Sequence, residues 1–409
     1  MRLSLARPAL AALLIGIAAQ LLFSVGVTRP SKLVFDEVHY VPAARVLAAE
    51  ARPANTEHPL LGKTLIAGGI AVFGDTPLGW RAMSTIAGTA TVLGVFAILL
   101  LLFGSVATAS YGALFAAVSM TVFVHARIAM LEPFLGALLT LGIAALLWAM
   151  RAPRGQVVRR WLLGAVLLGL ATGVKWTAAP YVAFAGIAFL VVREKQPEAW
   201  PGLGRITALA LLGFASVIAY FATFWPAFLY RDNPLTLARL IPFHRDMYLQ
   251  QTQVLSPHPY QSSWIGWPFD ARPIWYLYEP VDGAVRGILY LGNPAIMWGA
   301  LIAIVWLGVH WLRTGSRAAA GVAMLWAGSL GIWAVIPKSL GFYYYYYPSS
   351  IFACIALAAA FHLAGARLCL FWFAVLATAL FLYFYPIISA AALPNAQAFN
   401  RWMWFDSWR

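Results

Sequence analysis

The chain has 409 residues, of which 62% are hydrophobic and only 10% are charged, and its formal net charge is +14. Soluble proteins are usually about 45–50% apolar and about 25% charged, so this composition excludes a water-soluble enzyme, a disordered chain and a coiled coil. Long apolar runs instead predict a helical protein that crosses a membrane many times, and cytoplasmic loops explain the excess of Lys and Arg better than nucleic acid does.

The apolar runs predict where the chain crosses the membrane. The first run, 8–28, is longer than the apolar core of a signal peptide, about 7–15 residues, so we interpret it as an uncleaved first span. The run Thr64–Phe73 is too short for a bilayer, which needs about 20 residues, and predicts a helix in the membrane interface. Residues 82–126 lack Asp, Glu, Lys and Arg, and they predict two spans with a turn at Gly104-Ser105. Further apolar runs cover 133–150, 161–174, 176–192, 206–230, 287–312, 318–337, 339–366 and 368–390.

Together these runs predict an all-α polytopic membrane protein with about eleven transmembrane helices, the N-terminus inside and the C-terminus outside. In this topology the inside segments carry 12 basic and two acidic residues, so +10 of the total +14 lies inside. Counting the interfacial run as a span would put the Arg151–Arg160 cluster outside, against the preference of Lys and Arg for cytoplasmic loops. The basic residues assigned to the inside are Arg2, Arg7, Arg151, Arg154, Arg159, Arg160, Arg193, Lys195, Arg205, Arg313, Arg317 and Arg367.

Three parts of the chain follow from this topology. Residues 1–230 form a membrane module that includes a first external loop at 29–81, residues 231–286 form a second external loop, and residues 287–409 hold the last spans and an external tail. Most of the unusual polar residues fall on the outer side. We therefore expect the chemistry of the protein to take place there.

The first external loop carries two adjacent carboxylates, Asp36 and Glu37, followed by His39 and Tyr40. If a helix begins here, Asp36, His39 and Tyr40 share one face. A carboxylate beside an imidazole at a membrane surface suits a general base. The other interpretation is an ordinary acidic helix start that complements the helix dipole.

A second motif in the same loop contains Glu57, His58 and Lys63. His58 and Lys63 suit the binding of an anionic head group, and Glu57 suits a metal ligand or a residue that orients a neighbour. The alternative is a lysine that extends to the interface beside a capping glutamate.

Two further charged positions lie near the outer ends of spans. Arg127 and Glu132 could form a purely structural pair, because buried ions are usually paired. Lys175 lies between two short runs, which implies a turn below the membrane surface, where a lysine needs an anionic partner such as a lipid phosphate. The alternative is that Lys175 reaches the outer interface.

Aromatic residues gather in two external segments. The stretch His258–Pro268 includes His258 and Trp267, and the run Tyr343–Tyr347 enters a span. Tyrosines stack on sugar faces and donate hydrogen bonds, so Tyr343 and Tyr344 suit a sugar site. An aromatic belt at the membrane interface is the alternative.

Acids, cations and aromatics on one membrane face suit the transfer of a polar group from a lipid phosphate. Cations stabilise the leaving phosphate, and a carboxylate takes the proton from the acceptor hydroxyl. A secondary transporter is a rival, although transporters favour inverted repeats, and no internal repeat is present. A membrane scaffold would need neither Lys175 nor the paired carboxylates.

The motifs resemble those of the protein O-mannosyltransferases, membrane glycosyltransferases of the GT-C type. The resemblance runs from about residue 30 to the tail with Trp402, Trp404 and Trp408. Two positions depart from the family pattern: Leu60 replaces the second Pro of a common His-Pro-Pro motif, and Glu132 stands where Asp is frequent. The segments that carry it are Phe35-Asp36-Glu37-Val38-His39, His58-Pro59-Leu60-Leu61-Gly62-Lys63, Ala126–Glu132, Gly173-Val174-Lys175-Trp176 and His258–Pro268.

The resemblance implies a GT-C fold with a catalytic first external loop and an active site on the periplasmic or extracellular side of the cytoplasmic membrane. The implied donor is a polyprenyl-phosphate-linked mannose, and the implied acceptor is a Ser or Thr hydroxyl of an exported protein, attacked by direct inverting displacement. No nucleic acid and no cofactor is expected, although a divalent metal near Glu57 stays open. Because 231–286 is too short for an extra sugar-binding domain, the resemblance is to a bacterial member. A related branch that transfers sugars to lipid A or another glycan remains the alternative.

The resemblance also assigns roles to the candidate residues. Asp36 is the expected general base, with Glu37 as its partner or substitute. The phosphate of the donor is expected to bind His58, Lys63, Arg127 and Lys175. Orienting roles fall to Glu57, His39 and Glu132, which is expected to hold Arg127. The expected sugar or acceptor residues are His258, Trp267, Tyr343 and Tyr344.

Overall fold

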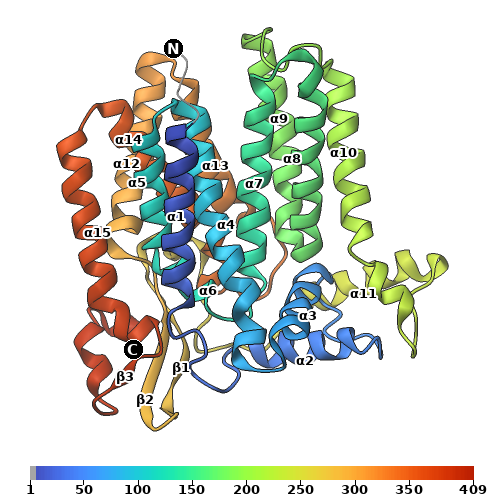
Figure 1. Cartoon of the computed structure of the whole chain (residues 1–409), viewed down its shortest axis with the longest axis vertical. Helices are drawn as coiled ribbons and strands as arrows, with labels where there is room; N and C mark the ends of the chain where they lie inside the picture. Colours follow the sequence, from blue (N-terminus) through green and yellow to red (C-terminus); the bar gives the residue numbers. More distant parts are fainter. Residues whose placement is uncertain (1–5) are drawn as a thin grey trace.

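The computed structural model describes residues 6–409, which form a bundle of long helices with short elements gathered at one end (Figure 1). Arg2, assigned above to the inside, lies outside the described residues. Within the described chain, nine helices are long and apolar enough to cross a membrane. They are α1 (Ala6–Ser24), α4 (Pro77–Phe103), α7 (Glu132–Met150), α8 (Arg154–Val174), α9 (Ala179–Lys195), α10 (Arg205–Ala222), α12 (Pro294–Thr314), α14 (Tyr347–Ala364) and α15 (Arg367–Ile388).

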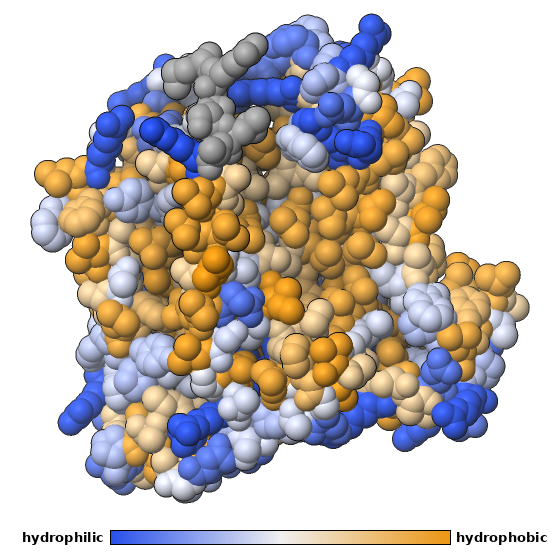
Figure 2. Space-filling view, in the orientation of Figure 1, coloured by the Kyte–Doolittle hydropathy of each residue, from blue (hydrophilic) through white to orange (hydrophobic). Residues whose placement is uncertain are grey.

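Two shorter helices occupy the remaining predicted spans. They are α5 (Val106–Ala117), with 12 residues, and α13 (Arg317–Gly331), with 15. The eleven spans therefore stay a prediction. On the face that Figure 2 shows, an apolar band crosses the middle of the bundle and polar residues gather at both ends, as expected of a multi-pass membrane protein.

The predicted turn at Gly104-Ser105 is confirmed, and its residues explain why the chain reverses there. Gly104 ends α4 in the left-handed conformation, with φ +64°, which glycine adopts at little cost. The Ser105 hydroxyl then accepts a hydrogen bond from the backbone N–H of Thr108 and caps α5. After α5 the chain breaks at Val118-Ser119 and continues as the short helix α6 (Met120–His125).

The all-α prediction is incomplete, because a small antiparallel sheet lies at the lower end of the bundle (Figure 1). Its strands are β1 (Ile274–Val281), β2 (Ala284–Tyr290) and β3 (Ala392–Leu393), in the order β1-β2-β3. The two-residue turn Asp282-Gly283 joins β1 to β2, and both residues have positive φ, the conformation that Asp-Gly favours in tight hairpins. Because β2 takes 284–290, the span predicted from residue 287 begins only at Pro294.

Three short helices share this end with the sheet: α2 (Glu37–Ala48), α3 (Leu61–Phe73) and α11 (Leu240–Thr252). The segment α3 packs against α2 and the start of α4. Short 3-10 turns complete the chain at Trp176–Ala178, Trp225–Leu229, Leu237–Arg239, Trp264–Phe269, Ile332–Ala334, Tyr343–Tyr346, Ala398–Trp402 and Asp406–Trp408. Both predicted external loops thus meet at one end of the bundle (Figure 1).

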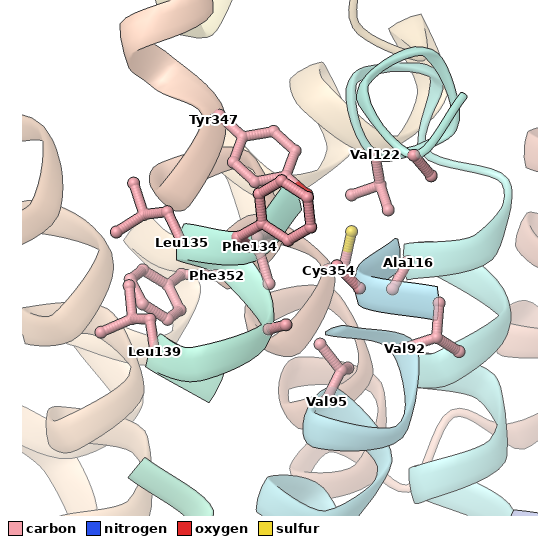
Figure 3. Close-up of a cluster of buried hydrophobic side chains, with 14 of the residues drawn as sticks. Val92, Val95, Ala116, Val122, Phe134, Leu135, Leu139, Tyr347, Phe352 and Cys354 are labelled. Carbon is pink, nitrogen blue, oxygen red and sulfur yellow. The ribbon is translucent and has the colours of Figure 1, made fainter. Parts of the chain in front are cut away.

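A close-packed core holds the helices that support this end (Figure 3). Helices α4, α5, α7 and α14 meet there through small and branched side chains such as Val95, Ala116 and Cys354. Gly94 lies so close to α7 that an added Cβ would come 2.2 Å from the Thr140 hydroxyl oxygen. Small residues at such contacts let helix backbones approach closely, which makes the support of the polar end rigid.

Candidate active site

Asp36 lies at the start of α2 and follows a strained residue. The preceding Phe35 has φ +47°, a conformation that bulky residues rarely adopt and that must be held by its surroundings. Its ring stacks on Tyr276 of β1 with ring centres 3.9 Å apart and an interplanar angle of 16°. The sheet therefore fixes the backbone that positions the Asp36 carboxylate.

The surroundings of Asp36 suit a proton acceptor. Burial and, to a smaller extent, Glu132 raise the pKa of the half-buried Asp36 carboxyl to about 6, while Lys175 and His39 oppose the shift. A general base works best when its pKa lies near the working pH. His39 is exposed beside Asp36, which matches its predicted neighbourhood and leaves its orienting role a prediction.

Glu37 has a structural place instead of the predicted catalytic one. Its side chain is fully buried, and the Arg81 guanidinium binds both carboxylate oxygens at 2.8 Å. The backbone N–H groups of Val34 and Ala129 donate to the same oxygens at 2.9 and 2.7 Å. With its oxygens occupied in this way, Glu37 ties the first loop to α4 and to the segment before α7.

A buried ion pair lies next to Asp36. The Lys175 ammonium, at the break between α8 and α9, binds Glu132 Oε1 at 2.6 Å. It also lies 5.3 Å and 5.2 Å from the ring centres of Tyr344 and Tyr345, close enough for cation–π attraction. Within the described residues, the second oxygen of Glu132 is buried without a hydrogen-bond partner.

The predicted orientation of Arg127 by Glu132 is wrong. Arg127 instead donates hydrogen bonds to the carbonyls of Phe23, at 2.9 Å, and Val25, at the end of α1. A cation there complements the negative end of the helix dipole. Its guanidinium is thus engaged in packing α1, and this position does not support the predicted phosphate contact.

The second motif closes the first loop on itself. Lys63 is fully buried and donates to the backbone carbonyls of Asn55 and, at 2.9 Å, His58. Burial lowers the pKa of Lys63 to about 7, partly opposed by Glu57. Burial also lowers the pKa of His58 well below its usual value, so its imidazole is neutral and can offer a phosphate only a hydrogen bond.

Two residues without a predicted role connect the external loops. Gln251, at the end of α11, lies with its Nε2 3.1 Å from His58 Nδ1 and donates to the carbonyl of Glu57. Its Oε1 accepts a hydrogen bond of 2.5 Å from Lys338. Burial and, to a smaller extent, Lys175 lower the pKa of Lys338 to about 8. The site thus brings together segments from four parts of the chain.

The predicted sugar or acceptor residues separate into two groups. Trp267 and Tyr343 are buried and engaged, because the Trp267 indole donates to Ser262 at 2.9 Å and the Tyr343 hydroxyl binds Asp270. They therefore support the site instead of lining it. Tyr344 faces Lys175, and His258 is exposed with its ring 5.3 Å from that of Phe342.

The donor set around Asp36 gives no cluster for a metal ion. Within residues 6–409, no three His, Cys, Asp or Glu side chains lie together in a way that could hold one. Glu57, the predicted metal or orienting residue, accepts a hydrogen bond from the Asn55 side chain. Metal dependence stays a prediction.

Comparison with known proteins identifies the family. Residues 57–223 match the family model described as dolichyl-phosphate-mannose-protein mannosyltransferase, and residues 236–408 match the one described as the C-terminal four-TMM region of protein-O-mannosyltransferase. The chain belongs to the protein O-mannosyltransferase family. It is thus an enzyme of a glycosyltransferase family.

The sequences of two relatives align with most of this protein O-mannosyltransferase family member. A polyprenol-phosphate-mannose–protein mannosyltransferase of Corynebacterium glutamicum is 28% identical over 92% of this chain and 88% of the relative. The protein of the same description from Mycobacterium tuberculosis strain H37Rv is 26% identical over 92% of this chain and 86% of its own.

Solved structures show that the fold is shared. The S. cerevisiae Pmt1-Pmt2 complex bound to the sugar donor superposes with a TM-score of 0.85 at 13% identity, covering 99% of this chain and 93% of that one. ArnT from Cupriavidus metallidurans bound to undecaprenyl phosphate gives a TM-score of 0.65 at 14% identity, over 92% and 76%. These likenesses confirm the GT-C fold of this protein O-mannosyltransferase family member.

Proposed function

We propose that the protein transfers mannose from a polyprenyl-phosphate-mannose donor to Ser or Thr hydroxyls of exported proteins, by direct inverting displacement. The family assignment supports the reaction class, and relatives named for polyprenol-phosphate mannose support the donor. The observation that carries the proposal is the half-buried Asp36, with a pKa of about 6, beside the buried Lys175–Glu132 pair.

In the proposed step, Asp36 accepts the proton of the acceptor hydroxyl while the oxygen of that hydroxyl attacks the anomeric carbon of mannose. The bond from that carbon to the phosphate oxygen breaks, and the lipid phosphate leaves with the electron pair. General-base assistance of this kind contributes about 10²–10⁴ to a rate. Attack opposite the leaving phosphate inverts the configuration at the anomeric carbon.

Lys175 is the proposed phosphate contact. Its ammonium lies near enough to Asp36 to affect the carboxyl pKa, and Glu132 holds it in one position. A fixed cation stabilises the charge that develops on the leaving phosphate, and it acts more strongly in a buried site than in water. The Tyr344 ring lies 5.3 Å from the same ammonium, and the sugar is attached to the phosphate that Lys175 would bind. We therefore propose this ring as the stacking surface for the sugar.

The geometry of α7 supports an active site on the outer face. Glu132 begins this helix near Asp36, and Arg151 follows its last residue at the other end. Nineteen helical residues span about 28 Å, close to the roughly 30 Å hydrocarbon core of a bilayer. The basic cluster Arg151–Arg160 and Asp36 would therefore lie on opposite sides, and basic clusters prefer the cytoplasm.

Transfer from a labelled donor tests the proposal. The purified protein in lipid nanodiscs would receive polyprenyl phosphate [¹⁴C]mannose, an unstructured Ser/Thr peptide and, separately, lipid A. We expect label in the peptide, and the one-bond C1–H1 coupling of the intact glycopeptide should show mannose with the anomeric configuration opposite to that in the donor. Label in lipid A alone, or no transfer to either acceptor, would overturn the proposed acceptor.

A further inference from the structure

A groove with a volume of about 540 Å³ lies between the first loop and β1, and we call it the β1 groove. Residues 32–35 of the first loop form one wall and residues 275–279 of β1 form the other, with Tyr260, Phe399 and Arg409 at its margins. Phe35, which directly precedes Asp36, lines the groove. The groove therefore reaches the residue next to the proposed catalytic carboxylate.

The lining shows that the groove follows the edge of the sheet. Successive side chains of a strand point to opposite faces, so a cavity over one face meets alternate residues. The β1 groove instead meets five consecutive residues of β1, and the bulge at Tyr276, where Trp275 and Leu277 oppose consecutive residues of β2, accounts for only one break in the alternation. This strand is at the edge of the sheet, with β2 on its only paired side. Within residues 6–409, no backbone hydrogen bond outside the hairpin involves 274–281.

The chemistry of the lining suits a polypeptide. Trp275 and Tyr278 provide aromatic surface, with their ring centres 4.9 Å apart. An ion pair between Lys32 of the loop wall and Glu279 of β1 joins the two walls. Charged groups of this kind are unsuited to a lipid chain. An unpaired strand edge binds extended peptides through main-chain hydrogen bonds, as in β-strand addition. Five β1 residues span about 16 Å, room for about five residues of a second strand.

We propose that the β1 groove binds the acceptor polypeptide as an extended strand along β1 and delivers its Ser or Thr hydroxyl to Asp36. This inference rests on the proposed function and adds the mode of acceptor recognition. Main-chain recognition accepts many sequences but requires an unfolded segment. Trp267 and Tyr343, which the sequence predicts as sugar or acceptor residues, are buried elsewhere. The aromatic residues of β1 would contact the acceptor in their place.

An N-methyl scan of an acceptor peptide tests this mode of binding. Each amide of a five-residue window around a single Thr would be methylated in turn. In a paired strand only alternate amides face the neighbouring strand, so we expect the acceptor KM to rise about tenfold at every second position and little at the others. A rise without this alternation, or no rise at any position, would contradict strand addition.

Groove variants provide the second arm. We expect Trp275→Ala to raise the acceptor KM about tenfold while the donor KM and the slow hydrolysis of donor by water stay unchanged, which also reports that the variant is folded. The matched control is Trp225→Ala, at a 62% exposed tryptophan outside the groove. An unchanged acceptor KM in Trp275→Ala would overturn the inference. Failure of the proposed function looks different, because the parent protein would then transfer no mannose to any peptide.

Discussion

Replacing Arg81 by leucine tests whether Glu37 holds the first loop in place instead of taking part in the chemistry. The guanidinium donates two hydrogen bonds to Glu37 at 2.8 Å and three more to the carbonyls of Val27, Pro30 and Lys32. Leucine removes all five and leaves the Glu37 carboxylate buried without a cation. Breaking a buried ion pair in this way costs about 3–5 kcal/mol of unfolding free energy.

Thermal unfolding of the purified protein in detergent measures this cost. We expect the Tm of Arg81→Leu to fall by roughly 6–20 °C, given about 2–4 °C per kcal/mol for a protein of a few hundred residues. The matched control is Arg45→Leu, because the Arg45–Asp75 pair is 39% and 49% exposed and such pairs contribute only about 0–1 kcal/mol. If Arg81→Leu unfolded at the temperature of the control but lost all transfer, the structural role of Glu37 would be refuted.

Three further predictions concern the site itself. Asp36 must be ionised to accept a proton, so kcat/KM should be constant above about pH 7 and fall about tenfold per pH unit below its pKa of about 6. A fall in kcat/KM only below about pH 4, the ordinary range of Asp, would contradict the raised pKa that burial gives this carboxyl. Lys175→Met should lower kcat/KM for the donor about 10²–10³-fold. The double variant Lys175→Met/Glu132→Gln removes both charges of the buried pair, so it should fold as the parent does and stay inactive. Donor turnover by Lys175→Met equal to that of the parent would exclude Lys175 as the phosphate contact. Chelation of divalent ions should leave transfer unchanged, whereas loss of activity that Mg²⁺ or Mn²⁺ restores would establish a metal requirement.

Much of the architecture could be predicted because it depends on local patterns. Apolar runs and the basic cluster Arg151–Arg160 placed the helices and grouped the external loops at one end of the bundle. The hairpin also had a local signal, since Asp282-Gly283 is a strong turn dipeptide between segments rich in aromatic and branched residues. The apolar stretch that begins at residue 287 favours a helix, and this longer pattern outweighs the hairpin signal.

The partners of buried charges could not be predicted, because they depend on contacts between distant segments. Lys175 lies 43 residues from Glu132, and Arg81 lies 44 residues from Glu37. The sequence interval of five residues between Arg127 and Glu132 suggested a pair, but the chain between α6 and α7 is not helical and the two side chains diverge. Spacing arguments need a regular element, and this segment has none.

The central claim is that Asp36 is the general base, and mannose transfer by Asp36→Asn tests it most directly. Asparagine keeps the shape of the side chain but cannot accept the hydroxyl proton, so we expect kcat to fall about 10²–10⁴-fold while donor binding and Tm stay close to those of the parent. Asp232→Asn, at an exposed carboxylate of the second external loop, is the matched control and should retain full activity. Transfer by Asp36→Asn at the rate of the parent protein would contradict the account.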